Sequence, residues 1–327
     1  MCAKIVQRLT MADFYMHRLL IEALKSLTDG SDESVIGAQG PDYFYYVLGS
    51  NKPQAQRLGH LIHHEQINGF LVNLLKSAKA HDSVAMLRYL YGFLSHHALD
   101  ISIHPYIFHY SGVYEENDPK THHWAGLHLQ FERKVDIAFI QNERNIKPHK
   151  HKLYQTTLPL KSLPEAVQTA ISEAVDATFN IPDAGSLFDQ GYQTMRKVGR
   201  LLVYDPLKIK RNLLGWVESY KKPKSTYFQD LSHAQNIQDF DYLNLKKTPW
   251  KHPVTGEAMT LSVPEMFDLA LKRSQAFIQA AQEAFDQNDP EILAQALPDA
   301  SYDTGLKWDE NQTMTHFTDY RTLVQKK

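Results

Sequence analysis

The 327-residue sequence predicts an all-α protein, and two observations carry this prediction. Apolar residues recur at intervals of three and four residues through most of the chain, which is the spacing of one face of a helix. The alternating apolar and polar pattern that is typical of strands does not recur. No internal repeat, low-complexity run or flexible linker divides the sequence, so we expect its helical segments to pack closely together.

Turn signals separate the expected helices. We expect helices over seven ranges, residues 11–27, 57–80, 82–107, 124–144, 163–180, 191–222 and 263–287. In the first of them, Leu20, Leu24 and Leu27 fall on one side. The third should stop or kink near its end, because Pro105 lacks an N–H group and its ring clashes with the preceding turn.

The connecting segments differ in character. Residues 37–49 (GAQGPDYFYYVLG) begin with Gly and Pro, so we expect a loop that enters an aromatic run. Residues 111–123 are expected to form a polar loop, and residues 241–257 an irregular connector.

Composition argues against several classes of protein. A formal net charge of -2 and a hydrophobic fraction of 43% are typical of a soluble globular protein. This net charge does not favour electrostatic binding to nucleic acid or to an anionic membrane, although a local basic patch can depart from the average. No apolar run reaches the roughly 18 residues of a transmembrane helix, and the first residues lack the pattern of a signal peptide. The single cysteine, Cys2, excludes an intrachain disulfide. We therefore expect a cytoplasmic protein, whose oligomeric state the sequence does not indicate.

Histidine is unusually concentrated in one part of the chain. Of the 17 histidines, 13 lie between His60 and His151. They punctuate apolar segments such as GFLSHHALDISIHPYI (92–107) and do not form a contiguous polar tract. Buried polar groups without partners are costly, and a metal ion satisfies imidazoles and carboxylates together. The distribution therefore indicates a metal site built on helices.

Spacing places several of these groups on shared helix faces. Residues four apart lie one above the other, so His96, Asp100 and His104 form a line in which one carboxylate separates two imidazoles. His128 and Glu132 repeat the spacing on another helix. Further candidates are Asp42 in the Gly-Pro loop, the pair His60 and His64 with His63 offset by one step, and the pair Asp13 and His17. One such pair alone is usually a surface ion pair, but the recurrence in separate segments favours a multinuclear metal site over a His-rich surface.

The same segments resemble the bacterial zinc-dependent phospholipase C family, whose all-helical fold is shared with the fungal-type zinc nucleases. The motifs that carry the resemblance are DFYMH, GAQGPDYFYY, GHLIHHE, GFLSHHALDISIHPYI and HLQFERKVD. We accordingly expect a metal-binding helical core over residues 11–155. The remainder, residues 156–327, is expected to be a helical C-terminal part packed on the same domain.

The resemblance also implies which residues hold zinc. The ligands of a first ion would be Asp42, His63, His96 and Asp100. The ligands of a second ion would be His104, His128 and Glu132. A third ion, which secreted members hold with an N-terminal tryptophan, is matched here only by His17 and Asp100. Because that tryptophan is absent, Asp13 is a candidate replacement, and the expected cofactor is two zinc ions with a third left open.

The activity implied by the resemblance is that of a zinc-dependent phosphodiesterase of the phospholipase C type, in which a metal-bound hydroxide attacks phosphorus. Asp42 would be a ligand and a proton acceptor, and Tyr43 would help to wall a headgroup pocket. The substrate would be a phospholipid headgroup or another small phosphoester. Two alternatives stay open: a nuclease or phosphatase on the same scaffold, and a non-catalytic protein that keeps its metal for stability.

Overall fold

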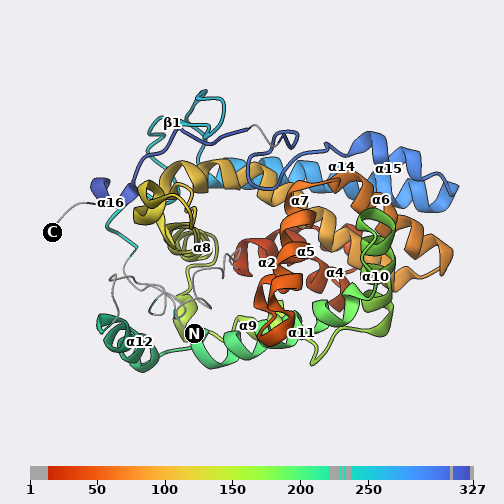
Figure 1. Cartoon of the computed structure of the whole chain (residues 1–327), viewed down its shortest axis with the longest axis horizontal. Coiled ribbons are helices and arrows are strands. Elements are labelled where there is room, and N and C mark those ends of the chain that lie inside the picture. Colours follow the sequence, from red (N-terminus) through yellow and green to blue (C-terminus); the bar gives the residue numbers. More distant parts are fainter. Residues whose placement is uncertain (1–13, 221–228, 230–231, 233–236, 310–311, 325–327) are drawn as a thin grey trace.

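The computed structural model describes residues 14–220, 229, 232, 237–309 and 312–324, and these residues are mainly helical (Figure 1). The longer helices are α2 (Phe14–Ala23), α5 (Lys52–His64), α6 (Ile67–Ala80), α7 (Val84–Ser111), α8 (Leu127–Arg144), α10 (Glu165–Phe179), α11 (Ala184–Val198), α12 (Ile209–Ser219) and α14 (Val263–Gln287). The short helices are α3 (Lys25–Thr28), α4 (Asp32–Gly37), α9 (Tyr154–Thr157), α15 (Pro290–Ala296) and α16 (Tyr320–Leu323). The 3-10 turns are η1 (Gly40–Tyr46), η2 (Gly49–Asn51), η3 (Pro119–Trp124) and η4 (Pro148–Lys150), and η5 (Gly199–Val203) is a π turn.

Only two short strands accompany the helices in the described part of the chain. Strands β1 (Trp250–Lys251) and β2 (Ala258–Met259) pair in antiparallel fashion. Strand β1 lies in the segment 241–257 that we expected to be an irregular connector, and β2 follows directly after that segment. The prediction of an all-α protein is confirmed.

Helix α7 is the centre of the fold (Figure 1). Nearly all of its side chains are buried, and α2, α4, α6, α8 and α14 pack around it. Glycines let α4 approach closely, since a Cβ atom on Gly92 would lie 2.0 Å from the carbonyl oxygen of Ser34. A Cβ atom on Gly40, at the start of η1, would lie 2.2 Å from the ring of His96. This tight packing fixes η1 against the middle of α7.

Of the two effects expected of Pro105, a stop or a kink, the stop is wrong. Helix α7 continues to Ser111, its last residue. The next residue, Gly112, has a φ of +62°, which favours glycine. Pro105 removes one backbone hydrogen bond to the carbonyl of Ile101, but the packing of a helix buried along its length outweighs that loss. Gly305 covers the freed carbonyl, since a Cβ atom there would lie 2.6 Å from the oxygen of Ile101.

Besides the short interruption at Leu24 between α2 and α3, two of the expected helices are broken. The segment 57–80 contains α5 and α6, which meet at Gln66 with a left-handed φ of +49°. The segment 191–222 contains the end of α11, then η5 and then α12. Pro206 lies in the second break. It favours a break there, because the residue before a proline disfavours helical backbone. Sequence periodicity continues across both breaks and therefore did not reveal them.

One hydrophobic core connects the two parts of the chain. Buried apolar side chains from Tyr15 in α2 to Tyr320 in α16 form a contiguous cluster, and α14 lies along α7 (Figure 1). Helix α14 begins with a capping box between Ser262 and Glu265 and matches the expected helix 263–287. The described residues include no helix with the length and apolar character needed to span a bilayer. The boundary near residue 155 stays a prediction.

Candidate metal centre

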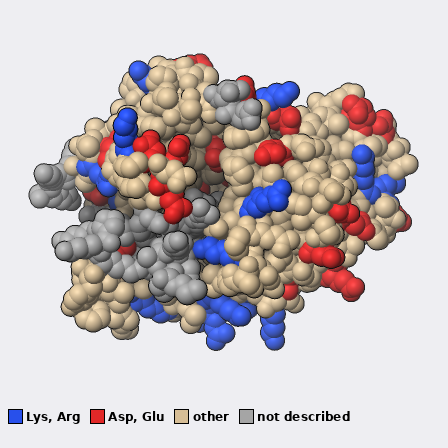
Figure 2. Space-filling model, viewed as in Figure 1, with Lys and Arg blue, Asp and Glu red and all other residues tan. Residues whose placement is uncertain are grey.

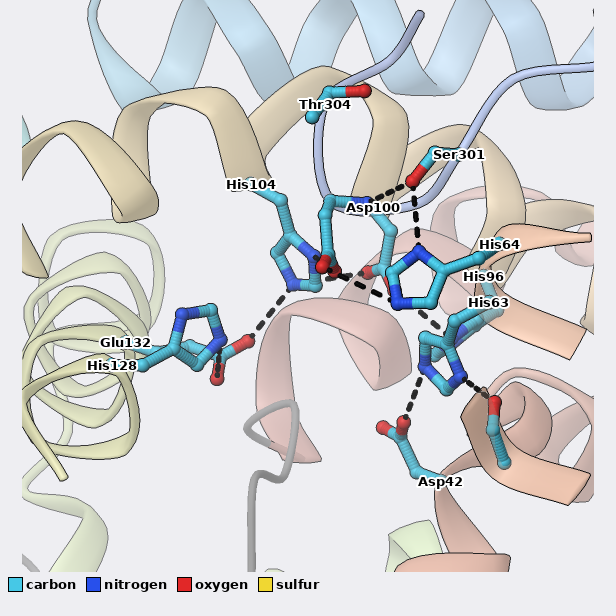
Figure 3. Close-up of polar contacts among 12 residues, drawn as sticks. Asp42, His63, His64, His96, Asp100, His104, His128, Glu132, Ser301 and Thr304 are labelled. Carbon is cyan, nitrogen blue, oxygen red and sulfur yellow. Dashed lines mark hydrogen bonds and ion pairs between the residues drawn. The ribbon is translucent and has the colours of Figure 1, made fainter. Parts of the chain in front are cut away.

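Five histidines and three carboxylates converge beside the middle of α7, and Figure 3 labels all of them except His17. They come from α2, η1, α5, α7 and α8, so segments far apart in the sequence meet here. Their ligand atoms form three groups, each lying within 4.8 Å: His17, His96 and Asp100; Asp42, His63 and His96; and His104, His128 and Glu132. The structure thus brings together all eight residues that the family resemblance implied as metal ligands, and their role as ligands stays a prediction.

Helix α2 is held in place by a carboxylate from α8. Asp136 accepts hydrogen bonds from the N–H groups of Tyr15 and Met16, at 3.2 and 2.6 Å. N–H groups in the first turn of a helix have no partner within the helix, so a carboxylate at this end stabilises it. The two bonds fix α2 so that the next residue, His17, faces α7.

Backbone carbonyls orient two of the imidazoles. Nδ1 of His63 lies 2.6 Å from the carbonyl oxygen one turn earlier in α5, and Nδ1 of His96 lies 3.2 Å from the carbonyl oxygen of Ala38. A carbonyl oxygen only accepts, so each Nδ1 carries a proton and each Nε2 is the nitrogen available to a metal. Nε2 of His63 faces Asp42 at 3.4 Å, and Nε2 of His96 faces Asp100 at 3.1 Å.

Asp100 lies where the groups meet. Its Oδ1 is 3.4 Å from Nε2 of His17 and 3.7 Å from Nε2 of His104. Its Oδ2 is 3.1 Å from Nε2 of His96, and the residue is only 2% exposed. A buried carboxylate that faces three imidazoles would be suited to hold metal together with them.

Helices α7 and α8 share the remaining group. Nε2 of His104 lies 3.3 Å from Oε1 of Glu132, and Nε2 of His128 lies 3.5 Å from Oε2 of the same carboxylate. Asp100, His104 and Glu132 also line a cavity between α2, α7 and α8. The cavity, about 20 Å³ in volume, has room for a water molecule beside these groups.

The nitrogen–oxygen separations favour a shared metal ion over direct hydrogen bonds. Charged N–H···O bonds are usually about 2.7–2.9 Å long. Five of the separations in this centre are 3.3–3.7 Å. Two ligand atoms bound to one tetrahedral zinc at about 2.0–2.1 Å lie roughly 3.3–3.4 Å from each other. Within the described part of the chain, the buried Oδ2 of Asp42 also has no hydrogen-bond partner, which leaves it open to a further ligand.

A family comparison agrees with this donor set. Residues 10–181 match a family model described as zinc dependent phospholipase C, a range that includes more than half of the chain and all eight residues of the centre. The chain belongs to the zinc-dependent phospholipase C family. No curated protein and no solved structure shows a significant match to the chain. Membership confirms the resemblance seen in the sequence and indicates zinc as the metal and a hydrolase as the class of protein.

Burial and charge separate the pKa values of the imidazoles in this zinc-dependent phospholipase C family member. Burial lowers the pKa of His17 to about 3 and that of His128 to about 4. Burial also acts to lower the pKa of His104, but Asp100 and Glu132 outweigh it and raise that pKa to about 10. Metals bind neutral imidazole, so His17 and His128 can bind at neutral pH directly, whereas His104 must first release a proton.

Tyr43 presents no surface to a substrate, so its assignment to a headgroup pocket is wrong. The side chain is fully buried, and its hydroxyl donates to a backbone carbonyl of α4 at 2.9 Å. Its ring packs edge-on against Phe188 and Tyr192 of α11. Tyr45 is the aromatic residue of η1 that faces the centre, with its hydroxyl 3.3 Å from Nδ1 of His63.

Two residues beside the centre come from the C-terminal part, beyond the range matched by the family. Tyr302 is fully buried, and its N–H donates to the carbonyl oxygen of His63 at 3.0 Å. Asp303 places Oδ2 3.6 Å from Nε2 of His64 and Oδ1 3.9 Å from Nδ1 of His104. Burial acts to raise the pKa of Asp303, but the two imidazoles outweigh it and lower that pKa, so the carboxylate is charged.

Sequence reasoning missed Tyr302 and Asp303. They lie in the segment SYDTG (301–305), where no histidine stands at helical spacing from the acid. An acidic residue beside a glycine turn is the sole signal there, and it is a common one. Asp13, the candidate replacement ligand, lies outside the described residues, so a third ion stays a prediction.

Proposed function

We propose that this zinc-dependent phospholipase C family member hydrolyses phosphodiesters at the centre beside α7. The observation that carries the proposal is the convergence of eight imidazole and carboxylate residues at separations suited to shared zinc ions. Zinc, when bound, supplies Lewis-acid activation of water and of a phosphoryl oxygen. The proposed substrate is a phospholipid headgroup or another small phosphoester.

We infer that Asp42 accepts the proton of the attacking water in addition to serving as a ligand. Its Oδ1 faces Nε2 of His63 at 3.4 Å, whereas among the described residues its Oδ2 has no hydrogen-bond partner. A carboxylate with one committed and one available oxygen can hold a metal and still receive a proton. Asp42 lies on η1, which is packed against α7 and α11, so its position is set before a substrate binds. No serine or cysteine nucleophile is needed.

A chromogenic phosphodiester tests this function. We expect the purified, zinc-loaded full chain to hydrolyse bis(p-nitrophenyl) phosphate, to lose that activity with a chelator and to regain it with zinc. Asp42→Asn should lower kcat by about 100-fold or more, the usual contribution of a positioned proton acceptor. Asp268→Asn, at an exposed position of α14, is the matched control and should leave kcat unchanged.

The same assay separates the alternatives. Faster turnover of a phosphomonoester or of an oligonucleotide would assign the centre to a phosphatase or a nuclease. No turnover of any phosphoester by zinc-loaded protein would contradict the proposal and leave a non-catalytic metal-binding protein. The cytoplasmic location is likewise a proposal, which fractionation of cells that produce the protein tests.

A further inference from the structure

Helix α12 turns its apolar residues outward. Seven large side chains, in α12 and directly before and after it, are strongly exposed: Leu201 (63%), Leu207 (75%), Ile209 (62%), Leu213 (56%), Trp216 (60%), Val217 (41%) and Tyr220 (73%). From Ile209 onward they stand at i, i+4, i+7, i+8 and i+11, which places them on one helical face. We call these seven residues the apolar face of α12.

The polar side of α12 faces the protein. Glu218 is 3% exposed and accepts a hydrogen bond from the N–H of Gln229 at 3.1 Å. Arg211 donates to the carbonyl oxygens of Gln229 and Ser232, at 3.0 and 2.8 Å. Asp205, also 3% exposed, accepts from the N–H of Arg211 at 2.8 Å. A surface helix normally buries its apolar stripe, and these bonds hold α12 in the reverse orientation.

The charges exposed beside the apolar face are positive. Residues 196–220 contain six Lys or Arg and two acids, Asp205 and Glu218, in a chain whose formal net charge is -2. Both acids are buried. The exposed basic side chains are Lys197, Arg200 and Lys208. In Figure 2, Lys and Arg side chains gather along the lower edge of the molecule, where α11 and α12 lie in Figure 1.

We propose that the apolar face of α12 docks on a lipid bilayer that carries anionic headgroups. A helix that exposes Leu and Ile together with Trp and Tyr, with basic residues around them, has the composition of helices that lie in the membrane interface. The apolar side chains enter the boundary between headgroups and acyl chains, while the basic side chains contact the anionic headgroups. This docking is independent of the activity proposed for the metal centre.

A second copy of the chain fits the face less well. Stable protein interfaces use about 20–30 residues on each side, whereas the apolar face has seven. In a two-fold contact the same surface meets itself, so the basic residues of the two copies would also lie near one another without buried acids to neutralise them. Size and charge therefore both favour the lipid surface.

Vesicle sedimentation with the full-length protein tests the proposal. We expect binding to vesicles of phosphatidylcholine mixed with phosphatidylglycerol, weaker binding to phosphatidylcholine alone, and a decrease as salt is added. Leu213→Ser combined with Trp216→Ser should weaken binding to the mixed vesicles by about tenfold or more, because it removes two of the inserted side chains. Leu245→Ser, at a residue 54% exposed outside the apolar face, is the matched control and should bind like the wild type.

Two further readouts keep the result interpretable. Because the replaced side chains are exposed, the double variant should unfold at the temperature of the wild type, and it should hydrolyse a soluble diester at the same rate. Vesicle binding is measured without turnover, so an inactive protein would leave this proposal standing.

Three results would overturn docking on anionic lipid. One is equal binding of the wild type and the double variant to the mixed vesicles, or no binding by either. Another is equal binding of the wild type to neutral and mixed vesicles. The last is a dimer, seen by light scattering, that the double variant converts to a monomer, which would make a second copy the occupant.

Discussion

At the scale of single residues, the centre depends most on Asp100, whose oxygens face imidazoles from both α2 and α7. Asp100→Asn preserves the shape of the side chain and removes its charge. Changes to residues that only support a metal ligand already weaken binding about 10–100-fold, so we expect a loss beyond about 100-fold here. The thermal stability of the zinc-loaded protein should fall with it, because metal binding also stabilises the fold. Competition with a chromogenic chelator measures the affinity, and a variant with wild-type zinc content and melting temperature would show that Asp100 is not a ligand.

Asp303 should act through His104. Its Oδ1 faces Nδ1 of that histidine at 3.9 Å, and a carboxylate on this side favours the tautomer that leaves Nε2 for the metal. We expect Asp303→Asn to weaken zinc binding by about tenfold, within the range for residues that orient a ligand. Asp299→Asn, an exposed position just before the same segment, is the control. Equal zinc affinities of the two variants in a chelator competition would remove Asp303 from the centre.

The sequence predicts those parts of the site that one helix fixes. His96, Asp100 and His104 share a face because residues four apart do so in any α-helix, and the structure shows them in line. Tyr43 and Tyr45 lie two residues apart in η1, and packing against α11 decides that Tyr43 is buried while Tyr45 faces His63. Contacts that depend on a distant element cannot be derived from spacing, which is why Tyr43 was misassigned.

At the scale of elements, the close approach of α4 to α7 sets the position of η1 and hence of Asp42. A Cβ atom on Gly92 would lie 2.0 Å from the carbonyl oxygen of Ser34, so Gly92→Ala must push the two helices apart. We expect the free energy of unfolding to fall by about 1–3 kcal/mol, the usual cost of overpacking, and zinc affinity to fall as η1 moves. Thermal and denaturant unfolding measure the free energy of unfolding, and competition with a chromogenic chelator measures the zinc affinity.

Gly69→Ala is the matched control for this substitution. Gly69 lies in α6, and a Cβ atom there meets nothing within 4 Å. Replacing an unhindered helical glycine by alanine usually stabilises by about 0.5–1 kcal/mol. If both variants were stabilised, the tight packing of α4 on α7 would be contradicted.

Helix ends were predictable where a local signal marks them. The capping box of Ser262 and Glu265 begins α14 at the expected place. Pro105 is a local signal for a helix end, yet α7 passes through it, because burial on all sides stabilises the helix more than one lost hydrogen bond destabilises it. Gln66, conversely, carries no local signal for the break between α5 and α6. Tertiary packing decided both cases.

At the scale of the whole molecule, the C-terminal part packs on the family region and also reaches its metal centre. Helix α14 lies along α7 (Figure 1). The segment 301–305 places Tyr302 beside His63 and Asp303 beside His104. The family match ends at residue 181, so these contacts lie beyond it. The sequence predicts the all-α class and the close packing of the C-terminal part. It does not show which residues of the C-terminal part approach the centre.

Zinc stoichiometry of the purified full-length chain tests the central claim most directly. Eight residues of the N/O type in three groups predict at least two tightly bound zinc ions per chain after expression with sufficient metal. Elemental analysis combined with protein quantification by amino-acid analysis measures this ratio. A value of two or more is the predicted result, and a value below one would contradict a multinuclear zinc centre.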